Sequence, residues 1–215
     1  MKFEYSSTYN WENALRGMRH PLESYAKSDS TFNGDSVCLG ENDLNLAQRL
    51  IAAGTPHDKF MRQIFVSVDI TAPLYWFKEA DTYKVGTTAN STSSMHRIAS
   101  TPITLDCFET DDFDNNIIEQ LNDPYLIQIQ GIIGFLETLR QKYLETKDIR
   151  YWKELIRWLP ESWLQTRTWT ADYEVLRNIY FQRQCHKLTE WHSFCKWVES
   201  LPYAKELITY TNKEN

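Results

Sequence analysis

The sequence predicts a helix-rich α+β fold with a small mixed or antiparallel sheet, folded as a single domain over residues 1–215. Three observations lead to this prediction. Most of the chain carries apolar residues at helical spacing, a few short segments alternate as strands do, and 215 residues suit one ordinary domain. Apolar residues make up 42% of the chain and aromatic residues 14%, which is enough to fill a large core.

The N-terminal half is predicted to alternate strands with helices. β-Branched and aromatic residues in a period of two indicate a strand, whereas apolar residues three and four positions apart indicate a helix. Gly, Pro, Asn and Asp mark the boundaries, because they cap helices or end them. The expected elements are a strand at 2–8, a helix at 10–18, a loop at 28–40, a helix capped by Asn42 or Asp43 and ended by Gly54, a strand at 64–70 and a helix that starts with Ala72 and Pro73.

The C-terminal half is predicted to be mostly helical after a polar loop. Ten Ser and Thr residues and few large apolar ones fall between residues 82 and 104, and long ordered loops of this kind are often functional. Asp172 is expected to close a strand and to cap the helix that follows it. The expected elements are an irregular loop at 82–104, a helical segment at 115–147 interrupted at Pro124, a helix at 148–159, a strand at 165–170 and one long last helix at 173–201.

Charge and composition argue against several classes of protein. The chain has 23 Lys and Arg against 29 Asp and Glu, and a net charge of -6 disfavours a DNA- or RNA-binding module and an anionic membrane surface as partner. No stretch approaches the roughly 18 uninterrupted apolar residues of a membrane helix, and the N-terminus lacks the apolar run of a signal peptide. We therefore expect a cytoplasmic protein with reduced thiols. The seven glycines form neither a dinucleotide-binding nor a P-loop motif.

A metal site and a cysteine nucleophile are the weaker interpretations of the C-terminal helix. His186 and Glu190 are four residues apart, as metal ligands can be, but ordinary pairing on a solvated helix face explains the same spacing. His186 and His192 would lie about 120° apart around that helix and would not face one metal. Cys185 and Cys195 fall among apolar positions, where a free cysteine packs as a small hydrophobe. We expect no metal.

Two segments carry side chains suited to phosphate recognition. Residues 83–97 combine hydroxyls, an amide, a glycine and three basic or potentially basic side chains. A flexible surface loop explains this composition equally well. Arg177 and Arg183 are interleaved with Tyr180 and Phe181, and a guanidinium beside rings can clamp a phosphate. Exposed arginines on an amphipathic helix are the alternative.

Landmarks in a fixed order run along residues 40–100 and 150–200. They are Ala53-Gly54 at a helix end, His57-Asp58-Lys59-Phe60 after it, the strand at 64–70, Ala72-Pro73 before an aromatic helix, the polar loop, Leu159-Pro160, Thr168-Trp169-Thr170, Asn178 and Arg183. This order resembles that of the flavin-dependent thymidylate synthases, the ThyX family.

The resemblance implies the family's α+β fold, usually a homotetramer that holds flavin and nucleotide at subunit contacts. It implies methylation of a pyrimidine deoxynucleotide such as dUMP, in which reduced FAD relays a one-carbon unit from a folate to the uracil ring and NADPH supplies the reducing power. The resemblance implies that the nucleotide is bound by Asn90, Thr92, Ser94, Arg157 and Arg183. It implies that the flavin is bound by Thr82, Tyr83, Lys84 and Asn178.

Several positions depart from the family's pattern. Residues 82–84 replace an Arg-His-Arg sequence, and only Lys84 keeps a positive charge. Asp172 and Glu174 place acids where Asn and Arg would favour a flavin diphosphate. Arg97 or His96 could restore charge from slightly further along the polar loop. A catalytically degenerate relative that binds a nucleotide or a partner without flavin is therefore the second interpretation.

Overall fold

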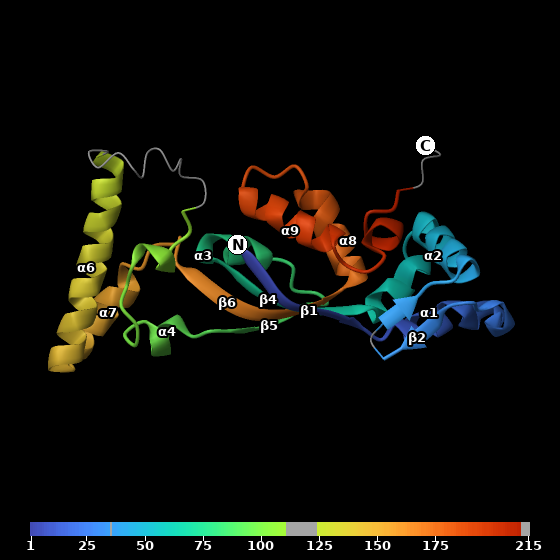
Figure 1. The fold of residues 1–215 in the computed structure, drawn as a ribbon, viewed down its shortest axis with the longest axis horizontal. Coiled ribbons are helices and arrows are strands. Elements are labelled where there is room, and N and C mark those ends of the chain that lie inside the picture. The colour runs from blue at the N-terminus through green and yellow to red at the C-terminus, as the bar shows by residue number, and fades with distance from the viewer. Residues whose placement is uncertain (35, 111–123, 212–215) are drawn as a thin grey trace. The chain divides into compact units, whose positions relative to one another are not determined.

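The computed structural model describes residues 1–34, 36–110 and 124–211 (Figure 1). Most elements are helices and the strands form a small sheet, so the predicted helix-rich α+β fold is confirmed. The chain divides into two compact units. The first unit comprises residue 1 and residues 71–79 and 91–167, and the second unit comprises residues 2–70, 80–90 and 168–215.

A four-stranded sheet has the order β1-β4-β6-β5, and its two central strands carry residues of both units. Thr168 Oγ1 donates to Asp69 Oδ1 at 2.6 Å, and the hydroxyls of Thr71 and Thr166 are 2.7 Å apart. Residue numbers rise along one strand as they fall along the other, so β4 and β6 are antiparallel. The strands are β1 (Lys2–Tyr9), β4 (Phe65–Pro73), β5 (Thr88–Ser91) and β6 (Leu164–Asp172).

Burial along β4 follows the period of two that its sequence predicts. Val66 and Ile70 are buried, and the residues between the buried positions are half-buried. The strands expected at 2–8, 64–70 and 165–170 are therefore confirmed. Strand β5 is an additional element inside the segment expected to be irregular loop.

Helices of the second unit pack around a core rich in aromatic rings. In this core the ring centroids of Trp191 and Phe194 are 5.5 Å apart, and the ring of Phe3 stacks on that of Trp197 with 5.1 Å between centroids. Gly54, with φ of 67°, ends α2 as expected. The helical elements are α1 (Trp11–Arg19), η1 (His20–Leu22), η2 (Tyr25–Lys27), α2 (Glu41–Ala53), η3 (His57–Gln63), α8 (Tyr173–Arg183), α9 (Thr189–Glu199) and η5 (Ala204–Ile208).

The start of α2 differs from the prediction. Gly40 is the N-cap residue, so neither Asn42 nor Asp43 caps the helix. The Asp29 carboxylate instead accepts hydrogen bonds from the backbone N–H groups of Asn42 and Asp43, at 2.9 and 3.1 Å. Asp43 is fully buried and forms an ion pair with Arg19, with 2.6 Å between Nε and Oδ1. The cap therefore comes from Asp29, which lies outside the helix. Asp43, inside the helix, instead pairs with Arg19 in the buried interior.

The segment before α2, expected to be loop, contains a small antiparallel hairpin. Strands β2 (Thr31–Asn33) and β3 (Ser36–Cys38) pair so that Phe32 faces Val37. Strands of three residues are too short to show a period of two, which is why the sequence pattern missed them.

The long last helix expected at 173–201 is wrong, because α8 ends at Arg183 and α9 begins at Thr189. Buried Ile179 and Trp191 are twelve positions apart, so in one continuous helix they would point about 120° apart. A turn between the helices lets both side chains reach the core. His186 and Cys185 lie in this turn, so His186 does not share a helix with Glu190, and Cys185 is exposed whereas Cys195 is buried.

The first unit contains two adjacent helices, α6 and α7 (Figure 1). Helix α6 begins at Pro124, a residue suited to a first helical turn. The part of the expected helical segment at 115–123 lies outside the described residues. Asp148 caps α7 by accepting a hydrogen bond from Arg150 N at 2.9 Å. The helical elements are α3 (Leu74–Ala80, whose last residue belongs to the second unit), α4 (Ser94–Arg97), η4 (Leu105–Cys107), α6 (Pro124–Thr146) and α7 (Ile149–Arg157).

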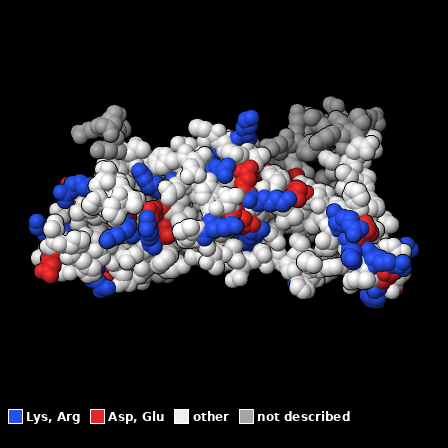
Figure 2. Space-filling view, turned by 180° about the vertical axis from the view of Figure 1, so that it is seen from behind, with Lys and Arg blue, Asp and Glu red and all other residues white. Residues whose placement is uncertain are grey.

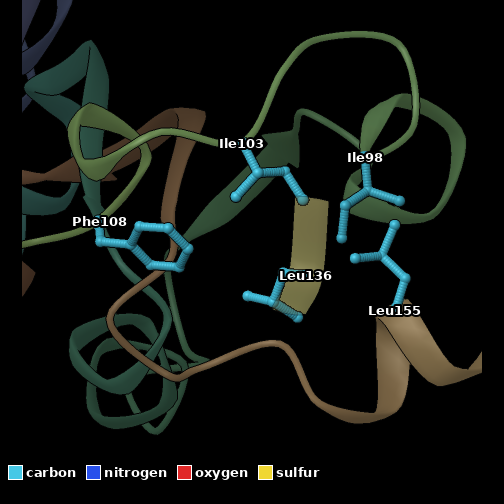
Figure 3. Close-up of a cluster of buried hydrophobic side chains, with 5 residues drawn as sticks. All are labelled: Ile98, Ile103, Phe108, Leu136 and Leu155. Atoms are coloured by element: carbon cyan, nitrogen blue, oxygen red, sulfur yellow. The ribbon is translucent and has the colours of Figure 1, made fainter. Parts of the chain in front are cut away.

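A cluster of buried side chains anchors the polar loop to these helices. Figure 3 shows Ile98 and Ile103 from the loop segment pointing toward Leu136 of α6 and Leu155 of α7, with Phe108 beside them. All five side chains are at most 7% exposed. The C-terminal part of the loop is therefore packed against a core rather than loose on the surface.

Glu137 fastens the same loop to α6. Its carboxylate accepts hydrogen bonds from Ile103 N at 2.9 Å and from Arg140 Nη2 at 2.6 Å. The Arg140 guanidinium is the main reason why the pKa of Glu137 falls from 4.5 to about 2.

We expect Glu137→Gln to lower the free energy of unfolding at pH 7 by about 1–2 kcal/mol. Because the folded-state pKa is lowered, the contribution of the carboxylate is complete above pH 4.5 and is lost as the pH falls toward 2. The difference between wild type and variant should therefore shrink over that range in urea titrations. Glu145→Gln, which removes an exposed i,i+3 pair with Lys142, is the matched control. A difference that stays constant with pH would contradict the prediction.

The surface is mixed in charge on the side shown in Figure 2, where acidic side chains lie among the basic ones. No helix in the described part of the chain has the length and apolar composition needed to cross a bilayer.

Candidate functional site

The first unit holds a small pocket beside the polar loop. It has a volume of about 230 Å³ and is lined mainly by hydroxyl side chains, with one guanidinium and one indole. None of its described lining residues is an acid. The lining residues are Thr92, Ser93, Ser94, Arg97, Ile98, Ser100, Thr101, Trp163 and Leu164.

Strand pairing fixes the first wall of this pocket. Thr92 N donates to Thr166 O at 2.9 Å, and Gln165 Nε2 donates to Thr92 O at 2.7 Å. Thr166 N also donates to Thr92 Oγ1 at 3.3 Å. The Thr92 hydroxyl is therefore held at the edge of β6.

The short helix α4 positions the second wall. Ser93 Oγ accepts a hydrogen bond from His96 N at 3.2 Å and lies 2.7 Å from His96 Nδ1. Arg97 Nε donates to Ser100 Oγ at 3.3 Å, which directs the guanidinium along the loop. Hydroxyl groups and a guanidinium, with no acid among the described lining residues, form an environment suited to an anion such as phosphate.

Trp163 adds an aromatic wall that the sequence analysis did not identify. Its ring meets Phe108 edge-on at a centroid distance of 5.5 Å. Ser100 and Thr101 were likewise not singled out. Trp163 lies far from the loop in sequence, and no local spacing links the two, so only the fold reveals this neighbour.

The predicted nucleotide residues are divided between the units. Thr92 and Ser94 line the pocket of the first unit, whereas Asn90 is exposed in the second unit. Arg157, at the last position of α7, forms an ion pair with Glu154 and is not among the lining residues of the described pocket.

Arg183 is held between aromatic rings in the second unit. Its guanidinium carbon lies 4.7 Å from the ring centroid of Trp191 and 5.5 Å from that of Tyr83. Arg183 Nε donates to Tyr83 Oη at 2.8 Å, and Tyr83 Oη donates to Gln182 Oε1 at 2.9 Å. This half-buried arginine is therefore fixed in one orientation before any ligand arrives.

Arg177 does not share this role. Arg177 Nη1 donates to Ile208 O and Tyr210 O, both at 2.7 Å, and the guanidinium lies 4.8 Å from the Phe181 ring. The Nη1 group of Arg177 therefore ties residues 208–210 to α8, and the interpretation of Arg177 as part of a phosphate clamp stays a prediction.

The other predicted flavin residues lie on the surface of the second unit. Thr82, Lys84 and Asn178 are exposed. Gly86, with φ of 76°, brings the loop close to α8, since a Cβ there would lie 2.9 Å from Asp172 Oδ2. Glycine is required at this turn.

The two acids that depart from the family's pattern are engaged within the protein. The Asp172 carboxylate accepts a hydrogen bond from Val175 N at 2.9 Å and so caps α8, and burial raises the pKa of Asp172. Glu174 forms an ion pair with Arg62, whose Nη2 donates to Glu174 Oε1 at 2.9 Å. The negative charge of each acid is therefore partly offset by a partner within the protein. Within the described ranges, no group of three His, Cys, Asp or Glu side chains is placed to hold a metal ion.

Comparison with known proteins identifies the fold. No family model and no curated protein matches the sequence. A crystal structure of the flavin-dependent thymidylate synthase ThyX from Helicobacter pylori, complexed with FAD and dUMP, is similar with a TM-score of 0.69 at 16% identity, covering 97% of this chain and 98% of that chain. A second ThyX structure from Helicobacter pylori with FAD and dUMP gives a TM-score of 0.67 at 16% identity, covering 94% and 96%. The predicted ThyX-like fold is confirmed.

Proposed function

We propose that the protein binds a pyrimidine deoxynucleotide such as dUMP and, together with FAD, catalyses one-carbon transfer of the thymidylate synthase type. The observation that carries this proposal is a pocket of hydroxyls and Arg97, with no acid among its described lining residues, in a chain with this fold. Two solved structures of similar fold hold FAD and dUMP.

Thr92, Ser94 and Arg97 would bind the nucleotide phosphate, and Trp163 would pack against the sugar or base. Arg183, fixed by Tyr83 and Trp191 within the second unit, belongs to the proposed nucleotide-binding set through the family resemblance. Asn90 and Arg157 belong to the proposed set through the family resemblance alone.

The residues present are compatible with a flavin. Lys84 and Asn178 are exposed and can meet the anionic and amide groups of FAD, while Asp172 and Glu174 already have partners. When bound, the flavin would supply hydride and one-carbon chemistry, and the protein would supply orientation and electrostatics. The proposal includes a folate donor, NADPH, a homotetramer and a cytoplasmic location, all of which rest on the family resemblance.

The engagement of Tyr83 favours a second candidate function, nucleotide binding without flavin. Tyr83 stands where the family's pattern has a histidine. Its hydroxyl already forms hydrogen bonds with Arg183 and Gln182. Of the residues at 82–84, only Lys84 carries a charge that could meet the flavin diphosphate.

Two titrations separate these functions. We expect FAD added to the purified protein to give a shifted visible spectrum, and dUMP to bind in calorimetry. Binding of dUMP without any flavin response would support the second candidate. No response to either ligand would overturn both.

Arg97→Ala is expected to weaken dUMP binding by about 1–2 kcal/mol, because an exposed charge-assisted contact to the phosphate is lost. Affinity for deoxyuridine, which lacks the phosphate, should not change. Arg150→Ala removes another exposed arginine of the same unit and serves as the control in the same calorimetric assay. Equal losses for dUMP and deoxyuridine would show that Arg97 does not contact the phosphate.

A further inference from the structure

Two side chains outside the small pocket of the first unit hold the backbone of the loop that lines it. Gln165 Nε2 donates to Thr92 O at 2.7 Å, and Trp152 Nε1 donates to Met95 O at 3.1 Å. These two carbonyls lie on either side of residues 93 and 94, which line the pocket, whereas neither donor is among its described lining residues. All of these residues belong to the first unit.

Gln165 can form its two hydrogen bonds in only one orientation. Its Oε1 accepts a hydrogen bond from Arg167 Nε at 2.9 Å, while its Nε2 donates to Thr92 O. A guanidinium can only donate and a carbonyl can only accept, so the two partners fix which end of the amide faces each of them. A glutamate here would lack the donor, and an asparagine would be one methylene shorter.

Arg167 is itself held in place by an aromatic ring. Its guanidinium carbon lies 3.9 Å from the centroid of the Phe77 ring, and Phe77 also belongs to the first unit. Arg167 and Gln165 are two positions apart on β6, so their side chains lie on the same face of that strand. Contacts therefore run from the Phe77 ring through Arg167 and Gln165 to the Thr92 carbonyl.

Trp152 fixes the other end of the segment. Its ring packs against the buried cluster that contains Leu155, and its indole N–H reaches the carbonyl of Met95 in α4. Ser94 and Arg97, which line the pocket, belong to the same short helix. A helix of four residues has few hydrogen bonds of its own, so a hydrogen bond from outside contributes strongly to its position.

We infer that Gln165 and Trp152 are positioning residues, which set the affinity of this pocket for a phosphate group without touching that group. Hydroxyls and a guanidinium on a short loop bind an anion well when their orientation is fixed in advance. The inference rests on the proposed function, because the phosphate is that of the nucleotide.

Calorimetry with dUMP, inorganic phosphate and deoxyuridine tests the inference. Gln165→Leu and Trp152→Phe each remove the donor and keep an apolar side chain of similar shape. We expect each variant to bind dUMP and inorganic phosphate three- to tenfold more weakly, the scale of one lost hydrogen bond, and to bind deoxyuridine within twofold of the wild type. Gln130→Leu and Trp158→Phe change an exposed glutamine and an exposed tryptophan of the same unit, and neither should alter any of the three affinities.

Hydrogen exchange of the free protein measures the same positioning without a ligand. Thr92 N donates to Thr166 O, and we expect this amide to exchange at least threefold faster in Gln165→Leu. The amide of Ile98, which is bonded within α4 and its C-cap, should respond in the same way in Trp152→Phe. Unchanged exchange in both folded variants would overturn the inference.

A double variant tests whether Arg167 acts through Gln165. Arg167→Leu should weaken phosphate binding in the wild-type background and should cause no further loss in the Gln165→Leu background. Additive losses would show that Arg167 attracts the anion directly, which would overturn its place in the line of contacts.

Three calorimetric results would overturn the inference. They are equal losses for dUMP and deoxyuridine, wild-type phosphate affinity in folded Gln165→Leu and Trp152→Phe, and no binding of dUMP or inorganic phosphate by the wild type. If the wild type binds inorganic phosphate but not dUMP, and both variants weaken phosphate binding, the result counts against the proposed function only.

Discussion

Asp43→Asn is expected to lower the free energy of unfolding by about 3–5 kcal/mol, because it leaves a buried arginine without its counter-charge. Arg19 is 3% exposed and Asp43 is fully buried, and their side chains meet at 2.6 Å. Asp43 Oδ2 also accepts hydrogen bonds from Ser30 Oγ at 2.7 Å and Ser28 Oγ at 2.9 Å. An asparagine amide would present a donor to at least one of these donors, so the loss is larger than that of one hydrogen bond.

The same ion pair predicts the direction of the pH dependence. Burial alone would raise the pKa of Asp43, but hydrogen bonds from Ser30, Arg19 and Ser28 hold it below its ordinary value of 3.8. Because the folded-state pKa is lowered, the carboxylate contributes its full stabilisation above pH 3.8 and loses it as the pH falls further.

Chemical denaturation of Asp43→Asn and of Glu41→Gln, an exposed acid on the same helix, would measure this effect. We expect the loss at Asp43 to exceed that at Glu41 by at least about 2 kcal/mol. A loss below about 1 kcal/mol for Asp43→Asn would show that Arg19 finds another partner.

Asp43 also shows where sequence reasoning reaches its limit. Acidic residues at a helix start predict a cap, and a capping acid is indeed present, but it is Asp29 from a preceding segment. Arg19 and Asp43 are 24 positions apart, so only the packing of α1 and α2 brings them together. The sequence correctly predicted the helix end at Gly54 and the helix cap at Asp172. Both features depend on residues that are close together in the chain.

The candidate site follows the same rule. The loop was identified by its hydroxyls and Arg97, all of which lie within one segment. Trp163, which lines the same pocket, follows α7 in the chain and could be placed only by the fold. Arg177 and Arg183 are indistinguishable by pattern, and the structure separates them because Arg177 binds backbone carbonyls whereas Arg183 is set between rings.

Arg183→Ala is expected to weaken dUMP binding by about 1.5–3 kcal/mol, roughly 10- to 150-fold, which is the scale of a charge-assisted hydrogen bond. Its effect should exceed that of Arg97→Ala, because Arg183 is half-buried and already oriented by Tyr83 and Trp191. A guanidinium held in place loses less side-chain entropy when it binds an anion.

Two further variants separate charge from orientation at Arg183. Arg183→Lys keeps the charge but loses the planar fork that stacks on Trp191, so we expect an intermediate loss of dUMP affinity. Tyr83→Phe keeps the ring but removes the hydroxyl that accepts a hydrogen bond from Arg183 Nε. We expect it to weaken dUMP binding by about 0.5–1.5 kcal/mol, because the guanidinium is then less firmly oriented. Lys187→Ala is the exposed control near the end of α8. If folded Arg183→Ala binds dUMP as tightly as the wild type, Arg183 is a packing residue of the aromatic core and the nucleotide does not reach it.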